Sequence, residues 1–538
     1  MKKIIIGLVG TLLLGFISFY IILPPLNVHV GIFWIWLIVS LIPLELAFIG
    51  KLLFANQQFI FNFNKENFKK IAIVFILPVA FIVYSVFTAI IYNPLVSSST
   101  YANRIKLNPI EFNEIKEVDF NKTAIVDRDS TLVLGDRVMG EMPELISQFD
   151  VAEDYSQVSY KDSVYRVTPL EYNGLVKYFT NKSEGIPAYI TVNATSGEAT
   201  LVKLKDLNLG GMKYVPSAMF GEDLNRKLRF AYPTEIFAEP SFEIDEKGHP
   251  WWICSTYTYK GIGMVKQVTG AVFLDPITGE STKYDLADVP AWADRVFPSD
   301  MIIEQIDQAG MYQEGFINSV FGQKNVFTST KGYNYIELNG DIYLYTGITS
   351  ANKDASNIGF VLVNLRTHEA KKIASSGADE NSAMGSAEGK VQNLGYKSTF
   401  PLLVNVGGRP TYLVSLKDNA GLVKMYGMID TEDYQKVVVV DKEQGLTVLK
   451  REYVKAYGSV AGSDAEILEK DITVALNSTV TFEGETLYYL EDQDALKYKI
   501  KYTTANEEVL PFLKQGLKLH VKYYKGNINE IESLSIIK

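Results

Sequence analysis

The sequence predicts a membrane-anchored α+β protein with three N-terminal transmembrane helices, repeated modules of a helix and an antiparallel β-hairpin, and a small C-terminal β-barrel. Three observations predict this fold class. The first 93 residues are overwhelmingly apolar, the rest alternates short apolar runs with turn residues, and one hairpin pattern recurs. The predicted segments are 1–93 (transmembrane), 94–114 (linker), 115–215, 216–310, 311–375 and 376–465 (four β-rich modules) and 471–538 (barrel).

Three apolar runs, residues 4–23, 30–50 and 71–92, are each about 20 residues long, which is enough to cross a hydrocarbon core of roughly 30 Å. The first is too long for a signal peptide and lacks a small-residue cleavage site. Lys2 and Lys3 precede it, and residues 51–70 carry four further lysines. Positive charge marks the cytoplasmic side. We therefore expect a multi-pass protein of the cell membrane with a cytoplasmic N-terminus and an extracellular domain after Asn93.

Two features of these runs bear on function. Glu45 lies about six residues, or roughly 9 Å, from Lys51 at the cytoplasmic end of the second run, so we expect it near the interface or paired with a neighbouring helix. Gly7, Gly10 and Gly15 would allow close packing of the first helix. One acid and three helices do not predict a transporter.

The extracytoplasmic part is acidic. Residues 1–93 carry six lysines and two glutamates, so a net charge of −10 for the whole chain leaves −14 for the remainder. Local basic patches aside, such a surface repels nucleic acid and anionic polymers, and we expect no nucleic-acid partner. Cys254 is the only cysteine, so no intramolecular disulfide forms and the cores alone must stabilise the domain.

The hairpin repeat is clearest when residues 249–255 are laid over 409–415, because each is followed by Gly-x-Val-Lys and a second strand that ends in Asp275 or Asp430. A third copy starts at residues 340–345, and a weaker fourth at 185–193 is expected to be truncated. Amphipathic helical stretches precede several copies, at residues 223–228, 300–308 and 379–392.

The last 68 residues predict five strands and a short helix, the element order of an OB-like barrel, at residues 472–482, 486–490, 496–502, 507–513 (the helix), 517–524 and 530–537. Lys497, Lys499 and Lys501 with Tyr498 and Tyr502 resemble a nucleic-acid surface. They also alternate as any half-exposed strand does. We expect a structural or protein-docking role for the barrel.

The segment from Phe273 to Glu280, a strand that ends in Asp-x-x-Thr-Gly-Glu, resembles the PepSY family of small bacterial extracytoplasmic modules. The resemblance implies a fold and a compartment and no reaction. The whole chain, helices included, also resembles an uncharacterised Gram-positive membrane-protein family.

No residue is predicted to be catalytic, cofactor-binding or metal-ligating. The four histidines, His29, His249, His368 and His520, are too far apart for a zinc-protease pair, and Cys254 is expected to be an inert core thiol. Residues 385–389 lack the nucleophile-elbow spacing. The acidic stretches at residues 127–129 and 491–494 lack an EF-hand pattern and are expected to be solvated turns. Two carboxylates distant in sequence would leave no local trace.

The sequence therefore predicts a non-catalytic, membrane-anchored scaffold or binding protein of the bacterial cell envelope, with an envelope or membrane protein as partner. An alternative is a cell-envelope hydrolase that uses a carboxylate pair, which a buried pair of acids converging in a pocket would support. A third is a subunit of a membrane transport complex.

Overall fold

A computed structural model describes residues 2–537 except 56–57, 60–68, 70–71, 121, 351–355, 459–466, 483–484, 504–505 and 526–527. It contains two compact units. Unit 1 comprises Met1–Asn108 and Asn121–Lys372, and unit 2 comprises Pro109–Phe120 and Ile373–Lys538. Lys65 and Lys70, on which the orientation prediction partly rests, lie outside the described residues.

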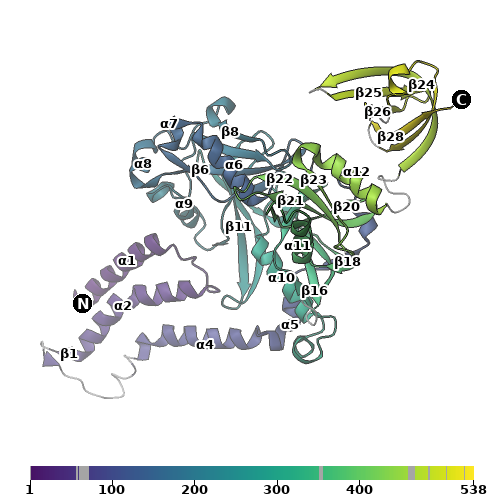
Figure 1. The fold of residues 1–538 in the computed structure, drawn as a ribbon. Coiled ribbons are helices and arrows are strands. Elements are labelled where there is room, and N and C mark those ends of the chain that lie inside the picture. Colours follow the sequence, from purple (N-terminus) through teal and green to yellow (C-terminus); the bar gives the residue numbers. More distant parts are fainter. Residues whose placement is uncertain are drawn as a thin grey trace. The chain divides into compact units, whose positions relative to one another are not determined.

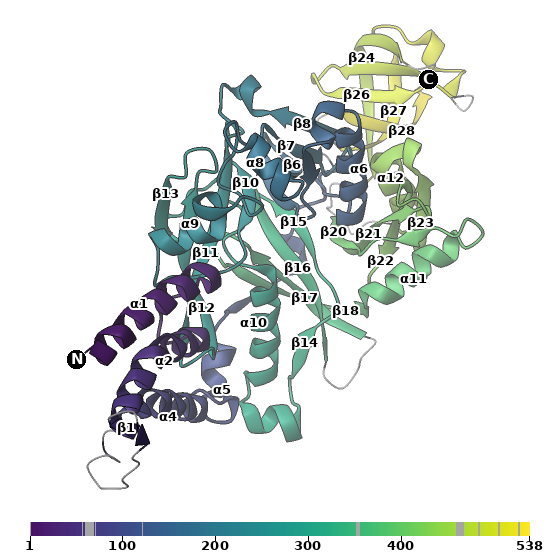
Figure 2. The same cartoon turned by 90° about the vertical axis from the view of Figure 1, so that its left-hand side faces the viewer.

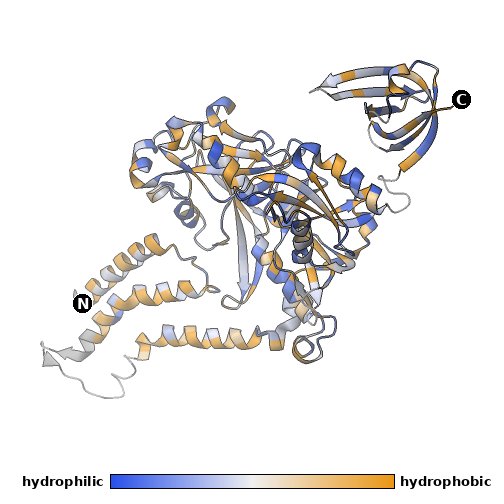
Figure 3. Cartoon of the chain, in the orientation of Figure 1, coloured by the Kyte–Doolittle hydropathy of each residue, from blue (hydrophilic) through white to orange (hydrophobic). Residues whose placement is uncertain are grey.

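Two N-terminal helices of unit 1, α1 (Lys2–Ile22) and α2 (Gly31–Leu53), are long and apolar enough to span a membrane, as predicted. The third predicted span differs. Helix α4 (Ile76–Ile91) is followed by α5 (Pro94–Ala102) at a bend of 67°, and only the bent pair reaches the length of a span. Asn93 makes the bend because its side chain accepts the Leu95 amide as an N-cap. Figures 1 and 3 show the apolar helices side by side.

The predicted close packing of the first helix is confirmed. A Cβ atom on Gly7 would lie 2.6 Å from the Ala47 Cβ, and one on Gly10 would lie 3.0 Å from the Pro43 Cβ. Without side chains at these positions, the backbones of α1 and α2 approach each other directly. After α2, β1 (Phe54–Ala55) and β2 (Gln58–Phe59) form a two-stranded sheet.

Four antiparallel sheets follow one plan, in which two short strands pair with the same long strand and two further strands complete a meander (Figure 2). The first holds β4 (Phe149–Val151), β5 (Ser156–Tyr160), β6 (Ser163–Tyr172), β7 (Ala188–Asn193) and β8 (Ala199–Lys203). The second holds β9 (Ile236–Phe237), β10 (Ser241–Ile244), β11 (Pro250–Lys260), β12 (Val265–Leu274) and β13 (Ser281–Asp285). The third holds β14 (Phe327–Ser329), β15 (Asn334–Leu338), β16 (Asp341–Ser350), β17 (Ser356–Asn364) and β18 (Ala370–Ala378), and β3 (Leu107–Ile110) adds a sixth strand beside β18. The fourth holds β19 (Lys397–Ser398), β20 (Leu402–Val406), β21 (Arg409–Lys417), β22 (Val423–Asp430) and β23 (Val437–Asp441).

Each sheet is preceded by a helix: α6 (Arg128–Gly140) with α7 (Pro143–Ile146), α9 (Leu224–Ala231), α10 (Ser299–Tyr312) and α11 (Glu380–Lys390). The body is therefore α+β, as predicted. Two further α-helices lie in these regions, α8 (Gly174–Asn181) and α12 (Gly445–Tyr457). The weak copy at residues 185–193 was expected to be truncated, and this expectation is wrong. Its predicted strand is the return strand β7, which pairs with β6, and β6 lies before α8 in the chain.

One turn explains the repeat physically. After the return strand of each sheet, an Asn or Asp side chain accepts the backbone amides two and three residues further on, at Asn193, Asp275, Asn364 and Asp430. Three copies then place a residue in the left-handed region, namely Gly197, His368 and Gly279. The Asp-x-x-Thr-Gly-Glu pattern is thus an Asx turn that reverses the chain between two strands.

The C-terminal barrel of unit 2 is closed by five strands in the order β24-β25-β26-β28-β27. These are β24 (Ile467–Phe482), β25 (Glu485–Asp492), β26 (Lys497–Lys501), β27 (Lys518–Tyr524) and β28 (Asn529–Ile536). The five predicted strands all form. Where a helix was predicted at residues 507–513, the described residues contain a 3-10 turn at Leu510–Phe512, and Leu510 contributes to the barrel core.

Candidate functional site

The ends of the apolar helices are bonded directly to the folded body of unit 1. Arg229 of α9 is buried and donates from Nε to the Leu23 carbonyl at the end of α1 at 3.0 Å, while its Nη1 bonds the Glu235 carbonyl at 2.6 Å. Burial lowers the pKa of Arg229 to about 10. The guanidinium of Arg226 lies 4.3 Å from the centre of the Tyr20 ring. Cations at this position satisfy carbonyls that a helix C-terminus leaves without partners.

A second connection involves the tip of the β11–β12 hairpin, which extends to the helices in Figures 1 and 2. The Gly261 carbonyl lies 3.1 Å from His29 Nδ1, and the Gly263 amide donates to the His29 carbonyl at 3.0 Å. A Cβ atom on Gly261 would lie 2.9 Å from the Tyr92 ring and 3.0 Å from Thr88. The tip therefore contacts both the α1–α2 loop and the end of α4. We call these contacts of Arg229 and Gly261 the helix–body joint.

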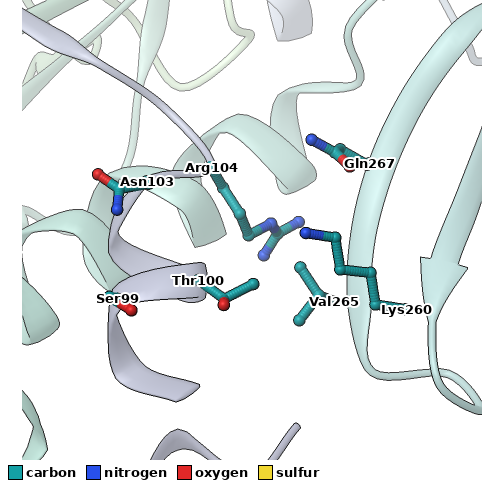
Figure 4. Close-up of a pocket in the computed structure, with 7 residues that line it drawn as sticks. All are labelled: Ser99, Thr100, Asn103, Arg104, Lys260, Val265 and Gln267. Atoms are coloured by element: carbon teal, nitrogen blue, oxygen red, sulfur yellow. The ribbon is translucent and has the colours of Figure 1, made fainter.

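A pocket of about 170 Å³ opens beside this joint. It is lined by Ser99, Thr100, Asn103, Arg104, Lys260, Val265 and Gln267, which come from α5, the residues that follow it and the β11–β12 hairpin. In the close-up, Arg104 and Lys260 direct their cationic groups toward the same space (Figure 4). We call it the Arg104 pocket.

Arg104 is the best-defined group of the pocket, because its side chain is only 1% exposed. Its Nε donates to the Lys266 carbonyl at 3.0 Å, and its Nη1 donates to Glu304 Oε1 at 2.9 Å and Gln308 Oε1 at 2.7 Å. Nη2 is buried and has no hydrogen-bond partner among the residues that the structure describes. A buried donor without a partner costs about 1–3 kcal/mol, so the guanidinium has unused binding capacity.

Groups packed near Arg104 remain neutral. His368 stacks on Phe297 with ring centroids 4.3 Å apart, and its Nε2 lies 2.6 Å from Gln305 Oε1. Burial, with a smaller effect of the Arg104 charge, lowers the pKa of His368 to about 4. The Tyr101 hydroxyl donates to the Tyr92 carbonyl. The charged groups at the pocket are therefore Arg104, Lys260 and the carboxylate of Glu304.

A second cluster of ionisable groups lies between the first two sheets. Glu243 of β10 is 0% exposed and accepts the amides of Asp294 at 2.8 Å and Arg295 at 3.0 Å, and Asp294, 3% exposed, accepts the Ser159 amide at 2.7 Å. Burial raises the pKa of Glu243 to about 7, and burial followed by the charge of Glu243 raises the pKa of Asp294. Backbone donors surround both carboxyls, and neither residue lines the Arg104 pocket. The pair can hold a proton and connects two sheets.

His249 and His520 each lie beside a carboxylate, and the cysteine is buried. His249 is 3.4 Å from Asp275, and His520 on the barrel is 2.7 Å from Asp471. Cys254 is fully buried, and burial raises the pKa of its thiol, as expected for an inert core residue. In the described part of the chain, no cluster of three or more His, Cys, Asp or Glu side chains is arranged to hold a metal ion.

Asp127, Asp492 and Tyr498 serve structural roles. Asp127 caps α6 by accepting the Ser130 amide. Asp492 is 1% exposed and accepts Lys470 Nζ at 2.9 Å and the Tyr498 hydroxyl at 3.1 Å. The expectation of a solvated turn is therefore wrong for Asp492, since its carboxylate is buried and bonded to Lys470 and Tyr498. Tyr498 is itself buried and cannot stack on a base.

Sequence reasoning did not single out Arg104, Lys260, Glu243 or Asp294. Glu243 carried one signal, because it interrupts the apolar strand Phe242–Ile244. Arg104 and Lys260 gave none, since 156 residues separate them and only the hairpin tip brings them together.

Comparison with known proteins does not assign the chain to a family. No family model matches the chain, and no curated protein matches it. Among solved structures, the chain is similar to the Pseudomonas aeruginosa PilY1 C-terminal domain, with 10% identity, a TM-score of 0.12, and coverage of 69% of this chain and 68% of that one. A TM-score this low carries no argument about fold or function.

Proposed function

We propose that the protein is a non-catalytic, membrane-anchored extracytoplasmic scaffold or binding protein of a bacterial cell envelope. The helix–body joint carries this proposal. Because Arg229 bonds the end of α1 and Gly261 packs on the end of α4, the body is presented directly at the membrane surface. The four similar sheets support the resemblance to PepSY-like modules, and the closed barrel supports an OB-like docking domain.

The joint also supports the orientation. Leu23, His29 and Tyr92, at the ends of α1, α2 and α4, all lie against the body. Three crossings with these ends on one side leave the N-terminus on the other side, where Lys2 and Lys3 fit a cytoplasmic location. Helix α4 then supplies the third crossing, and its bent continuation α5 lies on the side of the body.

Cysteine labelling tests this orientation with little background, because the native Cys254 is fully buried. Lys247→Cys lies in an exposed turn of the body, and Lys3→Cys lies at the start of α1. A membrane-impermeant maleimide should label the Lys247→Cys protein in intact cells and the Lys3→Cys protein only after permeabilisation. Labelling of both in intact cells would refute three crossings, since the two positions would then share one side.

The function is tested by crosslinking the tagged full-length protein in a Gram-positive host and identifying what co-purifies by mass spectrometry. Recovery of a defined envelope protein, lost in a variant without the barrel strands but kept in Glu243→Gln, supports a scaffold. Recovery of the protein alone contradicts it. A transporter as the sole partner would favour the third hypothesis, a transport-complex subunit.

The buried carboxyl pair gives the hydrolase alternative its one specific observation. A carboxyl with a raised pKa can act as a general acid, as the pair Glu243 and Asp294 would require. The burial of both carboxyls and their hydrogen bonds to backbone amides argue against this alternative, because a substrate could not reach them. Cleavage of purified wall fragments by the full-length protein, abolished in Asp294→Asn, would replace the scaffold proposal with the hydrolase.

A further inference from the structure

The Arg104 pocket holds more positive charge than its protein partners neutralise. Among the described residues, Glu304 is the one carboxylate bonded to Arg104, and it contacts Nη1 only, so Nη2 stays buried without a partner there. Lys260 faces the same space and forms no ion pair within the described part of the chain. Two like charges directed at one cavity repel each other, and an anion placed between them removes that repulsion.

The donors around the cavity suit one class of anion. Thr100 contributes a hydroxyl and Gln267 an amide near the guanidinium, and Ser99 and Asn103 are further polar lining residues. A tetrahedral oxyanion has several acceptor oxygens and no carbon skeleton to bury, so it can use donors from several directions. The volume of about 170 Å³ is several times the roughly 30 Å³ that one water occupies, so the cavity has room for such a group.

The position of the pocket indicates where the anion comes from. Lys260 is adjacent to Gly261, which packs against Thr88 and Tyr92 at the end of α4, and Ser99 lies on the bent continuation α5. If α4 lies in a bilayer, these residues stand at the height of the lipid headgroups, within about a helical turn or two of the apolar segment. A phosphate at this height is available both from lipid headgroups and from solution.

We infer that the Arg104 pocket is a phosphate-binding site, formed by the underused guanidinium of Arg104 and the facing ammonium of Lys260. The inference does not depend on whether the body is a scaffold or an enzyme. The acidic charge of the rest of the chain does not oppose it, because screening limits distant charges to about 10 Å while the two cations contact the ligand.

The test uses the full-length protein in nanodiscs of zwitterionic lipid with or without phosphatidylglycerol. Native mass spectrometry counts retained anionic lipid in the wild type, in Lys260→Gln and in Lys106→Gln, an exposed lysine near Arg104 that does not line the pocket. We expect Lys260→Gln to reduce retention about fivefold and Lys106→Gln to leave it unchanged. Arg104→Gln should reduce it further, and thermal unfolding of each variant identifies any that misfold.

In purely zwitterionic discs, inorganic phosphate is titrated against the thermal transition. Stabilisation that Lys260→Gln removes, without selective retention of phosphatidylglycerol, assigns the site to free phosphate. Selective retention of phosphatidylglycerol assigns it to a lipid headgroup. Neither response in the wild type, or equal losses in Lys260→Gln and Lys106→Gln, overturns the inference.

Discussion

The buried pair Glu243 and Asp294 makes the stability of the body depend on pH. Burial holds the pKa of Glu243 at about 7 in the folded state against an ordinary value of 4.5. The folded state therefore binds the proton more tightly than the unfolded state, and the free energy of unfolding falls as pH rises from 4.5 through 7. At about 1.4 kcal/mol for each pH unit, ionising Glu243 costs about 3 kcal/mol.

The perturbation that tests this is Glu243→Gln, which removes the titrating group and keeps its shape. The variant loses absolute stability, because its amide nitrogen faces a backbone amide donor, that of Asp294 or Arg295. Its dependence on pH between about 5 and 8 should nonetheless flatten by about 3 kcal/mol relative to the wild type. Asp206→Asn, an exposed acid, is the matched control and should keep the wild-type slope.

The assay is thermal unfolding of the full-length protein in detergent, followed by tryptophan fluorescence. Trp252 is a local reporter, since its ring lies 5.3 Å from that of Phe242, the neighbour of Glu243. Equal pH slopes in the wild type and Glu243→Gln would refute the reasoning, because they would show that Glu243 is already ionised in the folded state.

Five further substitutions, two of them matched controls, test the packing by the same thermal assay. Arg229→Met should cost about 1.5–3 kcal/mol, because charged hydrogen bonds to the end of α1 are lost, and an unchanged transition would show that the joint is not formed. Gly7→Ala should destabilise the protein, whereas Gly140→Ala, which has open space around it, should stabilise the protein by about 0.5–1 kcal/mol. A stability change of the same sign in both variants would contradict close α1–α2 packing. Gly279→Ala should cost about 1–3 kcal/mol more than Gly174→Ala, since both have positive φ but only the former meets the Tyr214 ring; equal costs would exclude that contact.

Local patterns predicted the elements whose causes are local. Two apolar runs appear as α1 and α2 because length and composition alone decide whether a helix can cross a bilayer. The turn after each return strand could be recognised in the sequence because the residues that form it are close together. In the second sheet these are Asp275, which accepts a backbone amide, and Gly279, which has a positive φ. The same reasoning located all five barrel strands, where alternation identifies the buried face.

The candidate site escaped prediction because its causes are not local. Arg104 acquires its importance from the Lys266 carbonyl and from Glu304, which lie 162 and 200 residues away. The bend at Asn93, which turns an expected linker into α5, depends on one cap and one proline and is invisible to hydropathy. Glu243 and Asp294 likewise meet only when two sheets pack together.

The joint also gives a physical reason for having more than one helix. A single helix attached at one point would let the body rotate about the membrane normal. Here the body is held at Leu23, His29 and Tyr92, three separate points at the ends of three helices. Three points define a plane, so the orientation of the body relative to the helices is fixed.

Lys260 adjoins one of these contacts, Gly261, so a phosphate bound between Lys260 and Arg104 would strengthen the same attachment. The lipid composition of the membrane would thereby change the stability of the attachment between the body and the helices.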